Sequence, residues 1–340
     1  MVTKKKTEKV QKTVKKADAA KAPATPEKRG AIDIVRKRFA EESGKDILKV
    51  LSGIRGAGKT TAIDAVIADL VKKGVPKANI IRLDFEDPSM RHMKTYKDVL
   101  DILKARKAEG RTYLFLEELD SLLDYEVLMG VLYGMKEYEV TVTTSNRKLF
   151  ASEVMNYFKG RLLRLALPAP DWPRDRGELE RVWGKMFLCD VLGGHALADA
   201  TAEERLAEFL SDHMGELFSL RKISRTLDIN GHKLHPNTVA EYLRALTDAF
   251  FIEAAPVYDT FEGAVVNIGA RYFWTDLALR DGRFGPSPEL EEERLKYTKK
   301  YLELRRTRGK VMCEKSETFF ANFVVTDREG KKEIVKWKEF

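Results

Sequence analysis

The segment 51–61 holds the residues of this chain best able to do chemistry. It reads LSGIRGAGKTT, and Gly53–Thr60 fits the phosphate-loop pattern of a glycine, four residues and then Gly-Lys-Thr. Glycines let the backbone turn where a Cβ would clash, so that its N–H groups can wrap a triphosphate. We therefore expect ATP to bind here. The residues expected to line it are Gly53, Arg55, Gly56, Ala57, Gly58, Lys59, Thr60 and Thr61.

Two side chains of this segment have specific expected roles. Lys59 would reach the β- and γ-phosphates, and the Thr60 hydroxyl would hold Mg²⁺. A buried strand over 46–52 precedes the loop, and apolar residues at helical spacing over 61–71 follow it. Strand, glycine-rich turn and helix are the order that a phosphate loop requires, and the helix would point its positive end at the phosphates. The alternative is a glycine-rich turn that binds nothing.

A second candidate feature, a pair of acidic residues, follows the apolar segment 113–116. Glu117 and Glu118 stand where an ATPase needs one acid near Mg²⁺ and another to activate the attacking water. We assign Glu117 to the metal and Glu118 to the role of general base. The usual metal acid is aspartate, so the longer Glu117 either weakens metal positioning or acts through a water molecule. A strand that merely ends in acidic residues is the alternative.

Two further residues are candidates for the same chemistry. Asn146 follows the predicted strand 138–144 and could hydrogen-bond the γ-phosphate or the attacking water. Arg161 follows Gly160 at the start of the predicted strand 161–167 and could complete a neighbouring subunit's site as an arginine finger. Both could instead be ordinary turn residues.

The elements that would position these residues alternate along the first half of the chain. Strands are predicted over 46–52, 79–85, 111–118, 138–144 and 161–167, with helices over 31–40, 61–71, 96–107, 119–135 and 152–158. This alternation predicts an α/β fold with a parallel, doubly wound sheet.

A proline-rich break at 167–173 marks a domain boundary. Helices predicted over 221–228 and 236–250, joined by a turn at Gly231 and followed by an extended segment, have the order of a winged helix–turn–helix. A helical hairpin that packs on the core would look similar. Basic residues that could contact DNA phosphates are Arg221, Lys222, Arg225, His232 and Lys233.

The last ninety residues have a mixed pattern. A strand is predicted over 271–276, a charged helix over 290–304, and two strands over 319–325 and 332–337. We expect four parts: a Lys-rich tail (1–29), a phosphate-loop domain (30–168), a helical and winged-helix domain (169–260) and a small α/β domain (261–340).

The net charge of +8 lies mainly in the tail, which holds nine lysines and one arginine against three acids. Such a segment cannot bury enough surface to fold, so it is either an electrostatic arm for nucleic acid or a solvated tail. No apolar run is long enough to span a bilayer, and no apolar segment follows the tail as a secretory signal requires. Cys189 and Cys313 lack metal-ligand spacing, which favours free thiols in the cytoplasm.

Taken in order, several segments resemble the AAA-type ATPases of bacteria and archaea that carry a DUF4143 C-terminal region. The matching segments are LSGIRGAGKTT, RLDFED, YLFLEELDSL, VTTSN, KGRLLRL, NTVAEYLRALTDAFFIEAAPVYD and RYFWTDLALRDG, within about residues 31–282. The resemblance implies an ATPase core related to the origin-recognition clade, a winged helix and a C-terminal domain like a restriction endonuclease. It places the family's nucleotide residues on Gly53, Gly58, Lys59, Thr60, Glu117, Glu118, Asn146 and Arg161.

The C-terminal region departs from the pattern of an active nuclease. Asn322 stands where the family has an acid, and Ile334 stands where a nuclease would have Glu or Gln, although Lys336 is retained. Glu317 and Glu333 are close in sequence but do not match the required positions. Because a metal-dependent nuclease needs clustered carboxylates, we expect a structural or docking role and no DNA cleavage.

These features predict an oligomeric ATPase that uses Mg²⁺ and couples its nucleotide state to duplex DNA or protein partners. The alternative, motivated by Glu117, is a nucleotide-gated switch or adaptor with little hydrolysis.

Overall fold

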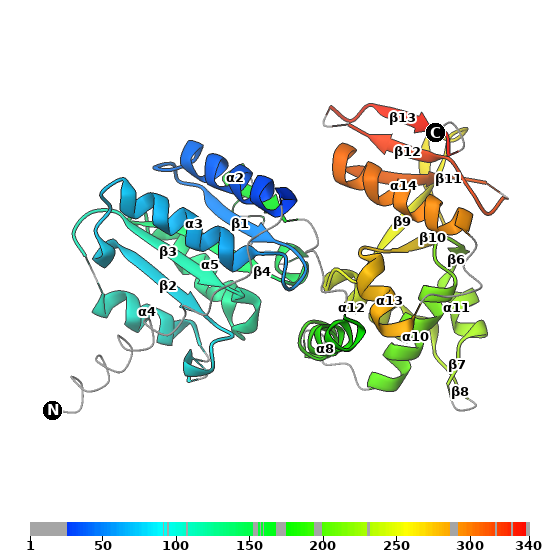
Figure 1. The fold of residues 1–340 in the computed structure, drawn as a ribbon, viewed down its shortest axis with the longest axis horizontal. Helices are drawn as coiled ribbons and strands as arrows, with labels where there is room; N and C mark the ends of the chain where they lie inside the picture. Colours follow the sequence, from blue (N-terminus) through cyan, green and yellow to red (C-terminus); the bar gives the residue numbers. More distant parts are fainter. Residues whose placement is uncertain are drawn as a thin grey trace.

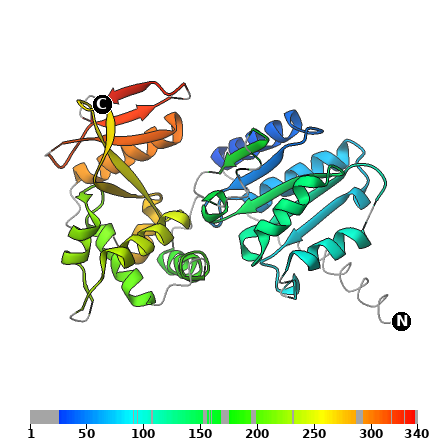
Figure 2. The same ribbon diagram turned by 180° about the vertical axis from the view of Figure 1, so that it is seen from behind.

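The computed structural model describes two lobes that lie side by side (Figures 1 and 2). It describes residues 26–90, 92–93, 95–106, 108–151, 156, 158, 160–167, 175–193, 199–229, 232–285, 292–316, 318–327 and 329–337. Most of the Lys-rich tail, the predicted helix 152–158, Gly231 and Glu317 lie wholly or largely outside these residues. No helix among the described residues is long and apolar enough to cross a bilayer.

The first lobe is built on a five-stranded sheet in the order β2-β3-β4-β1-β5, with every neighbouring pair parallel. Its strands are β1 (Leu48–Ser52), β2 (Ile80–Asp84), β3 (Thr112–Glu117), β4 (Tyr138–Thr144) and β5 (Leu162–Ala166). Its helices are α2 (Pro26–Glu41), α3 (Lys59–Lys72), α4 (Tyr96–Ala105), α5 (Tyr125–Gly134) and the short α6 (Lys148–Ala151). The predicted parallel α/β sheet is confirmed.

Helices cover both faces of this sheet, so its strands are apolar on both sides. Leu51 and Phe115 pack with α2 and α3 in one core, whereas Val50 and Leu116 pack with α4 and α5 in another. Neighbouring residues of one strand thus enter different cores, as the two-residue period of a strand requires. One difference from the sequence prediction is that 119–135 is not one helix. It holds a 3₁₀ turn at Leu119–Ser121 and then α5.

The second lobe combines helices with a six-stranded sheet in the order β13-β12-β11-β9-β10-β6. Its helices are α8 (Arg176–Met186) with the π-helical turn η4 (Phe187–Leu192), α10 (Ala200–Asp212), α11 (Leu220–Thr226), α12 (Pro236–Asp248), α13 (Leu277–Phe284) and α14 (Glu292–Arg308). Its strands are β6 (Leu217–Phe218), β9 (Ile252–Asp259), β10 (Ala264–Trp274), β11 (Lys310–Glu314), β12 (Phe323–Thr326) and β13 (Lys332–Val335), besides a small hairpin of β7 (Asp228–Ile229) and β8 (His232–Lys233).

The expected boundary at residue 260 does not separate two sheets. It falls in the turn between β9 and β10, which pair antiparallel from Ile252 to Asp259. Strand β11, which the sequence analysis missed, then pairs parallel with β9 at Cys313 and Val257. The C-terminal segment therefore continues the sheet that begins in the preceding segment.

Close packing between α8 and α13 gives a stability prediction. A Cβ added at Gly282 would lie 2.5 Å from the Leu179 Cβ, whereas a Cβ at Gly184 would meet no atom within 4 Å. Gly282→Ala should lower the free energy of unfolding by about 2 kcal/mol because the helices must move apart. Gly184→Ala, the control, should raise it by roughly 0.5 kcal/mol because alanine favours the helix. Urea unfolding of the two variants tests this pair, and equal effects would contradict it.

Candidate nucleotide-binding site

The loop between β1 and α3 has the backbone that its glycines permit. Gly56 and Gly58 have φ angles of 83° and 95°, in the left-handed region, and Gly58 caps the N-terminus of α3. A Cβ added at Gly53 would lie 3.0 Å from the Leu167 carbonyl oxygen. Each glycine is thus needed either for conformation or for close approach. The loop leads into the first turn of α3, where Thr60 is exposed and Thr61 is half-buried.

Strand register brings the ends of β1, β3 and β4 to one edge of the sheet. Ser52 pairs with Thr144, and Leu116 pairs with Val142. The residues that follow these strands therefore meet at the carboxyl edge. β4 lies between β1 and β3, so its end is the bridge between the phosphate loop and the acidic pair.

Lys59 is the centre of this meeting point. Its side chain is buried, and its Nζ donates hydrogen bonds to the Gly53 carbonyl oxygen (2.8 Å) and to the Ser145 Oγ (2.7 Å). The same Nζ lies 3.3 Å from the Glu118 Oε1. The structure therefore brings the predicted phosphate-binding cation and the predicted general base into one ion pair.

Glu118 is held in an uncommon backbone conformation. Its φ of 49° and ψ of 51° are left-handed, which costs energy for a residue other than glycine. Its main-chain N–H donates to the Thr143 Oγ1 (3.0 Å), and its Oε2 accepts from the Ser145 N–H (2.9 Å). These contacts fix the carboxylate beside Lys59.

Glu117 has a different environment. It is 1% exposed and forms an ion pair with Arg82 of β2, which also pairs with Asp64 at 2.7 Å. Asp84 lies level with Glu117 on the neighbouring strand, and burial raises the pKa of its carboxyl, as do the nearby Glu117 and Glu118. Asp84 is not among the residues expected from the sequence to form the site.

The donor set fits Mg²⁺ only together with a nucleotide. Among the described residues, no group of three His, Cys, Asp or Glu side chains could hold a metal ion. Magnesium in phosphate sites, however, is commonly bound by one or two carboxylates plus the phosphates. The Thr60 hydroxyl, Glu117 and Asp84 would supply the protein's share of such a site.

Asp120 is a nearby carboxylate that the sequence analysis overlooked. Burial, and then the charge of Glu118, raise the pKa of Asp120 to about 7. Its Oδ1 has no hydrogen-bond partner among the described residues. The available sequence signal was the position of Asp120, two residues after Glu118. In the structure the 3₁₀ turn Leu119–Ser121 keeps this residue close to the edge of the sheet.

Asn146 lies at the same edge but faces the second lobe. Its Nδ2 donates to the main-chain oxygen of Asp190 (3.1 Å), and its Oδ1 accepts from the Lys148 N–H (2.8 Å). Ser145, its neighbour, is the residue that contacts Lys59. The residues that follow β4 therefore contact the loop, Glu118 and η4.

Arg161 lies at the opposite edge of the sheet. Leu162 pairs with Leu48 at the start of β1, so the level of Arg161 is six residues before Gly53, about 20 Å of strand. The guanidinium forms an ion pair with Asp46 and lies 4.1 Å from the centre of the Tyr133 ring. The structure does not bring Arg161 to the loop of its own chain.

Two arginines connect this edge to the second lobe. Arg55, within the phosphate loop, contacts Glu86 and Asp190. Arg147, directly after Asn146, contacts Glu253 at 2.7 Å and donates its main-chain N–H to the Asp248 oxygen. No local sequence pattern indicates either of these pairings.

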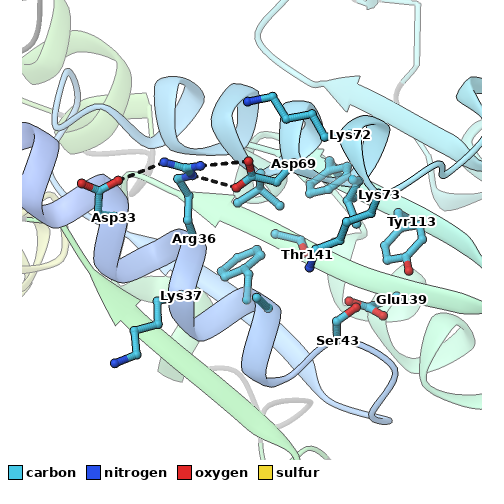
Figure 3. A pocket seen from close by; sticks show the side chains of 15 residues that line it. Asp33, Arg36, Lys37, Ser43, Asp69, Lys72, Lys73, Tyr113, Glu139 and Thr141 are labelled. Atoms are coloured by element: carbon cyan, nitrogen blue, oxygen red, sulfur yellow. Dashed lines mark hydrogen bonds and ion pairs between the residues drawn. The ribbon is translucent and has the colours of Figure 1, made fainter.

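A cavity of about 460 Å³ lies elsewhere, between α2, α3 and the sheet (Figure 3). Phe39, Leu70 and Phe115 form part of its apolar wall, and Arg36 crosses its rim to Asp69 near the C-terminal end of α3. The phosphate loop lies at the other end of this helix. The cavity is therefore separate from the candidate nucleotide site.

The residues at the positions compared with nuclease residues are held by contacts within the second lobe. The Asn322 Nδ2 donates to Glu314 (2.8 Å), and its Oδ1 accepts from the Trp337 N–H. Ile334 is half exposed, and Glu333 pairs with Arg308. Asn322 thus links strand ends within the second sheet.

Comparison with known proteins finds a family match within the first lobe. Residues 45–170 match the family described as "AAA domain". An "Uncharacterized protein" of Haemophilus influenzae is 21% identical, over 71% of this chain and 70% of that protein. Solved structures that match include the ORC2 protein of Aeropyrum pernix (11% identity, 78% of this chain and 96% of that chain, TM-score 0.32). Another is domain III of the Thermotoga maritima replication initiation protein DnaA (15% identity, 65% and 92%, TM-score 0.31).

Against C. elegans PCH-2 the identity is 11%, the coverage is 65% of each chain and the TM-score is 0.28. The family match spans the strands and loops that form the candidate site. Residues 45–170 are thus similar to AAA domains, and they have the parallel-sheet fold of a P-loop nucleoside triphosphatase.

Proposed function

We propose that this chain binds ATP and Mg²⁺ at Gly53–Thr60 and hydrolyses ATP. The observation that carries the proposal is the contact between Lys59, Glu118 and Ser145 at one edge of the sheet. The Lys59 Nζ lies 3.3 Å from the Glu118 Oε1 and 2.7 Å from the Ser145 Oγ, and the Ser145 N–H donates to the Glu118 Oε2 at 2.9 Å. A glycine-rich turn without a ligand would not need a buried lysine beside a strained glutamate. This pairing supports the proposal independently of the loop pattern.

Each residue has a defined part in the proposed reaction. The loop N–H groups and Lys59 hold the phosphates, and Thr60 with Glu117 contributes to the Mg²⁺ site. The bound Mg²⁺ supplies neutralisation of the phosphate charge. Glu118 accepts the proton of the attacking water, and Asn146 orients that water or the γ-phosphate. Arg161 would act in the site of a neighbouring copy, which makes the working form a homo-oligomer.

The second lobe supports a proposed DNA or partner contact. We take the order α10, β6, α11, the β7–β8 hairpin, α12, β9 and β10, with β6, β10 and β9 as adjacent antiparallel strands, as support for a winged helix. Arg221, Lys222 and Arg225 are exposed on α11. These cations, with the Lys-rich tail, would bind phosphates of duplex DNA. The sheet β11–β13 would serve as a docking surface without nuclease activity, in the manner of a degenerate restriction-endonuclease-like domain.

We place this activity in the cytoplasm, because Cys189 and Cys313 are free thiols in the structure. The resemblance to chains with a DUF4143 region and to the origin-recognition clade is part of the same proposal.

A nucleotide-gated switch with little hydrolysis is the second candidate. The Arg82–Glu117 pair favours it, because Glu117 is already neutralised by a guanidinium. A switch would bind ATP and change partner affinity without rapid turnover.

ATP turnover with and without duplex DNA tests the proposal. We expect slow basal turnover, about tenfold stimulation by DNA that falls as salt is raised, and background turnover in Lys59→Ala. Turnover equal in the wild type and in Lys59→Ala would refute the ATPase. Tight ATP binding without turnover would establish the switch.

A further inference from the structure

Asp190 connects the second lobe to the carboxyl edge of the first sheet, where the candidate nucleotide site lies, through two different acceptor groups. Its carboxylate accepts from Arg55 Nε (3.0 Å) and Nη2 (2.5 Å), and its main-chain oxygen accepts from Asn146 Nδ2 (3.1 Å). The Asp190 side chain is 6% exposed. One residue of η4 thus engages a donor of the phosphate loop and a donor at the end of β4.

These two donors are suited to phosphate oxygens. Arginine recognises carboxylates and phosphates by the same bidentate geometry. Arg55 lies within the eight-residue loop, and Asn146 adjoins the residue that contacts Lys59. In this arrangement the Asp190 carboxylate binds the Arg55 guanidinium, the same group that a bound triphosphate could use.

The contact is also electrostatically crowded. Arg55 is shared with Glu86, whose carboxylate contacts the same guanidinium at 2.6 Å. Burial raises the pKa of Asp190 even though Arg55 lies beside it, and Glu118 and Glu86 add to that rise. An additional anion at this edge would therefore weaken the hold of Arg55 on Asp190.

We propose that Asp190 competes with the terminal phosphate of a bound nucleoside triphosphate for Arg55 and Asn146, so that triphosphate binding releases η4 from the phosphate loop. The inference rests on the proposed nucleotide site and adds a specificity residue to it. Because coupling is reciprocal, a partner that pulls η4 away would tighten triphosphate binding.

The contacts behind η4 provide the route into the second lobe. Trp183 of α8 stacks on Phe187 of η4, with ring centres 4.6 Å apart, and meets Phe251 edge to face at 5.8 Å. Phe251 directly precedes β9. Displacement of η4 would therefore disturb the core on which the proposed winged helix is built.

Asp190→Asn tests the competition, since it keeps the shape of the side chain and removes its charge. We expect a non-hydrolysable ATP analogue with Mg²⁺ to bind the variant about tenfold more tightly than the wild type, and ADP to change less than twofold. Asp190→Ser is the second variant and should act in the same direction. Titration calorimetry measures both ligands.

The control is Asp69→Asn. Asp69 accepts a matching pair of hydrogen bonds from Arg36, at 2.7 and 2.9 Å, but joins α2 to α3 within one lobe (Figure 3). It should leave the affinities for both nucleotides unchanged. If Asp69→Asn tightened binding equally, general charge removal would explain the effect and the proposal would be wrong.

Hydrogen exchange supplies a readout that does not depend on affinity. The ATP analogue should speed amide exchange over 187–192 in the wild type at least threefold, and should have little further effect in Asp190→Asn. Unchanged exchange in the wild type, or equal affinity of wild type and variant, overturns the competition. Absence of nucleotide binding in both proteins instead refutes the nucleotide site itself.

Discussion

The Glu118→Gln variant should hydrolyse ATP about a thousandfold more slowly than the wild type, because a positioned general base commonly contributes a factor of this order. Its nucleotide affinity should stay within about threefold. The amide oxygen of glutamine can still accept from the Ser145 N–H, as the Glu118 carboxylate does at 2.9 Å. The variant loses the ability to take a proton, together with the negative charge that lies 3.3 Å from the Lys59 Nζ.

Rapid-quench measurement of a single turnover, beside calorimetric titration of ATP, separates these two effects. Glu126→Gln is the control, because Glu126 is exposed on α5 and should tolerate the change. Loss of affinity in proportion to the loss of turnover would assign Glu118 to nucleotide binding. Unchanged turnover would exclude it as the base.

Much of this site could be predicted because its signals are local. The loop pattern places Lys59, and an apolar run ending in two acids places Glu118. Parallel strands then bring both to one edge, as the register confirms for β1, β3 and β4. The same geometry explains why Arg161, which precedes its strand, lies at the other edge.

Contacts between distant segments could not be predicted. Asn146 and Asp190 are 44 residues apart, and nothing near either residue indicates the other. The domain boundary expected at residue 260 failed for a related reason. It falls in an exposed turn that resembles a linker in the sequence, whereas the pairing of β9 with β10 across that turn is visible only in the structure. Strand β11 is short and follows a charged helix, so its pairing with β9 decides its structure.

A buried acid in the second lobe should make the free energy of unfolding depend on pH. Glu203 of α10 is fully buried, and neither carboxylate oxygen has a hydrogen-bond partner among the described residues. Burial raises the pKa of Glu203 to about 9, from an ordinary value near 4.5. Tyr242 is a titratable neighbour, and the Glu203 main-chain N–H donates to the Asp199 main-chain oxygen (3.2 Å). Glu203 is therefore protonated in the folded chain at neutral pH.

The sign of the effect on stability follows from proton linkage. Above pH 4.5 the unfolded chain releases the Glu203 proton while the folded chain keeps it, so stability falls as pH rises until about pH 9. Each pH unit costs about 1.4 kcal/mol, which makes the loss roughly 3 kcal/mol at pH 7. Glutamine cannot ionise, so Glu203→Gln removes this loss.

We therefore expect the advantage of Glu203→Gln over the wild type in the free energy of unfolding to grow with pH. Between pH 5.5 and 8.5 it should increase by about 4 kcal/mol. Urea unfolding followed through the buried Trp183 measures it. Glu204→Gln is the control, since Glu204 is half exposed beside Arg283 and should shift stability by less than about 1 kcal/mol at every pH. An advantage of Glu203→Gln that is independent of pH would show that Glu203 is ionised in the folded chain.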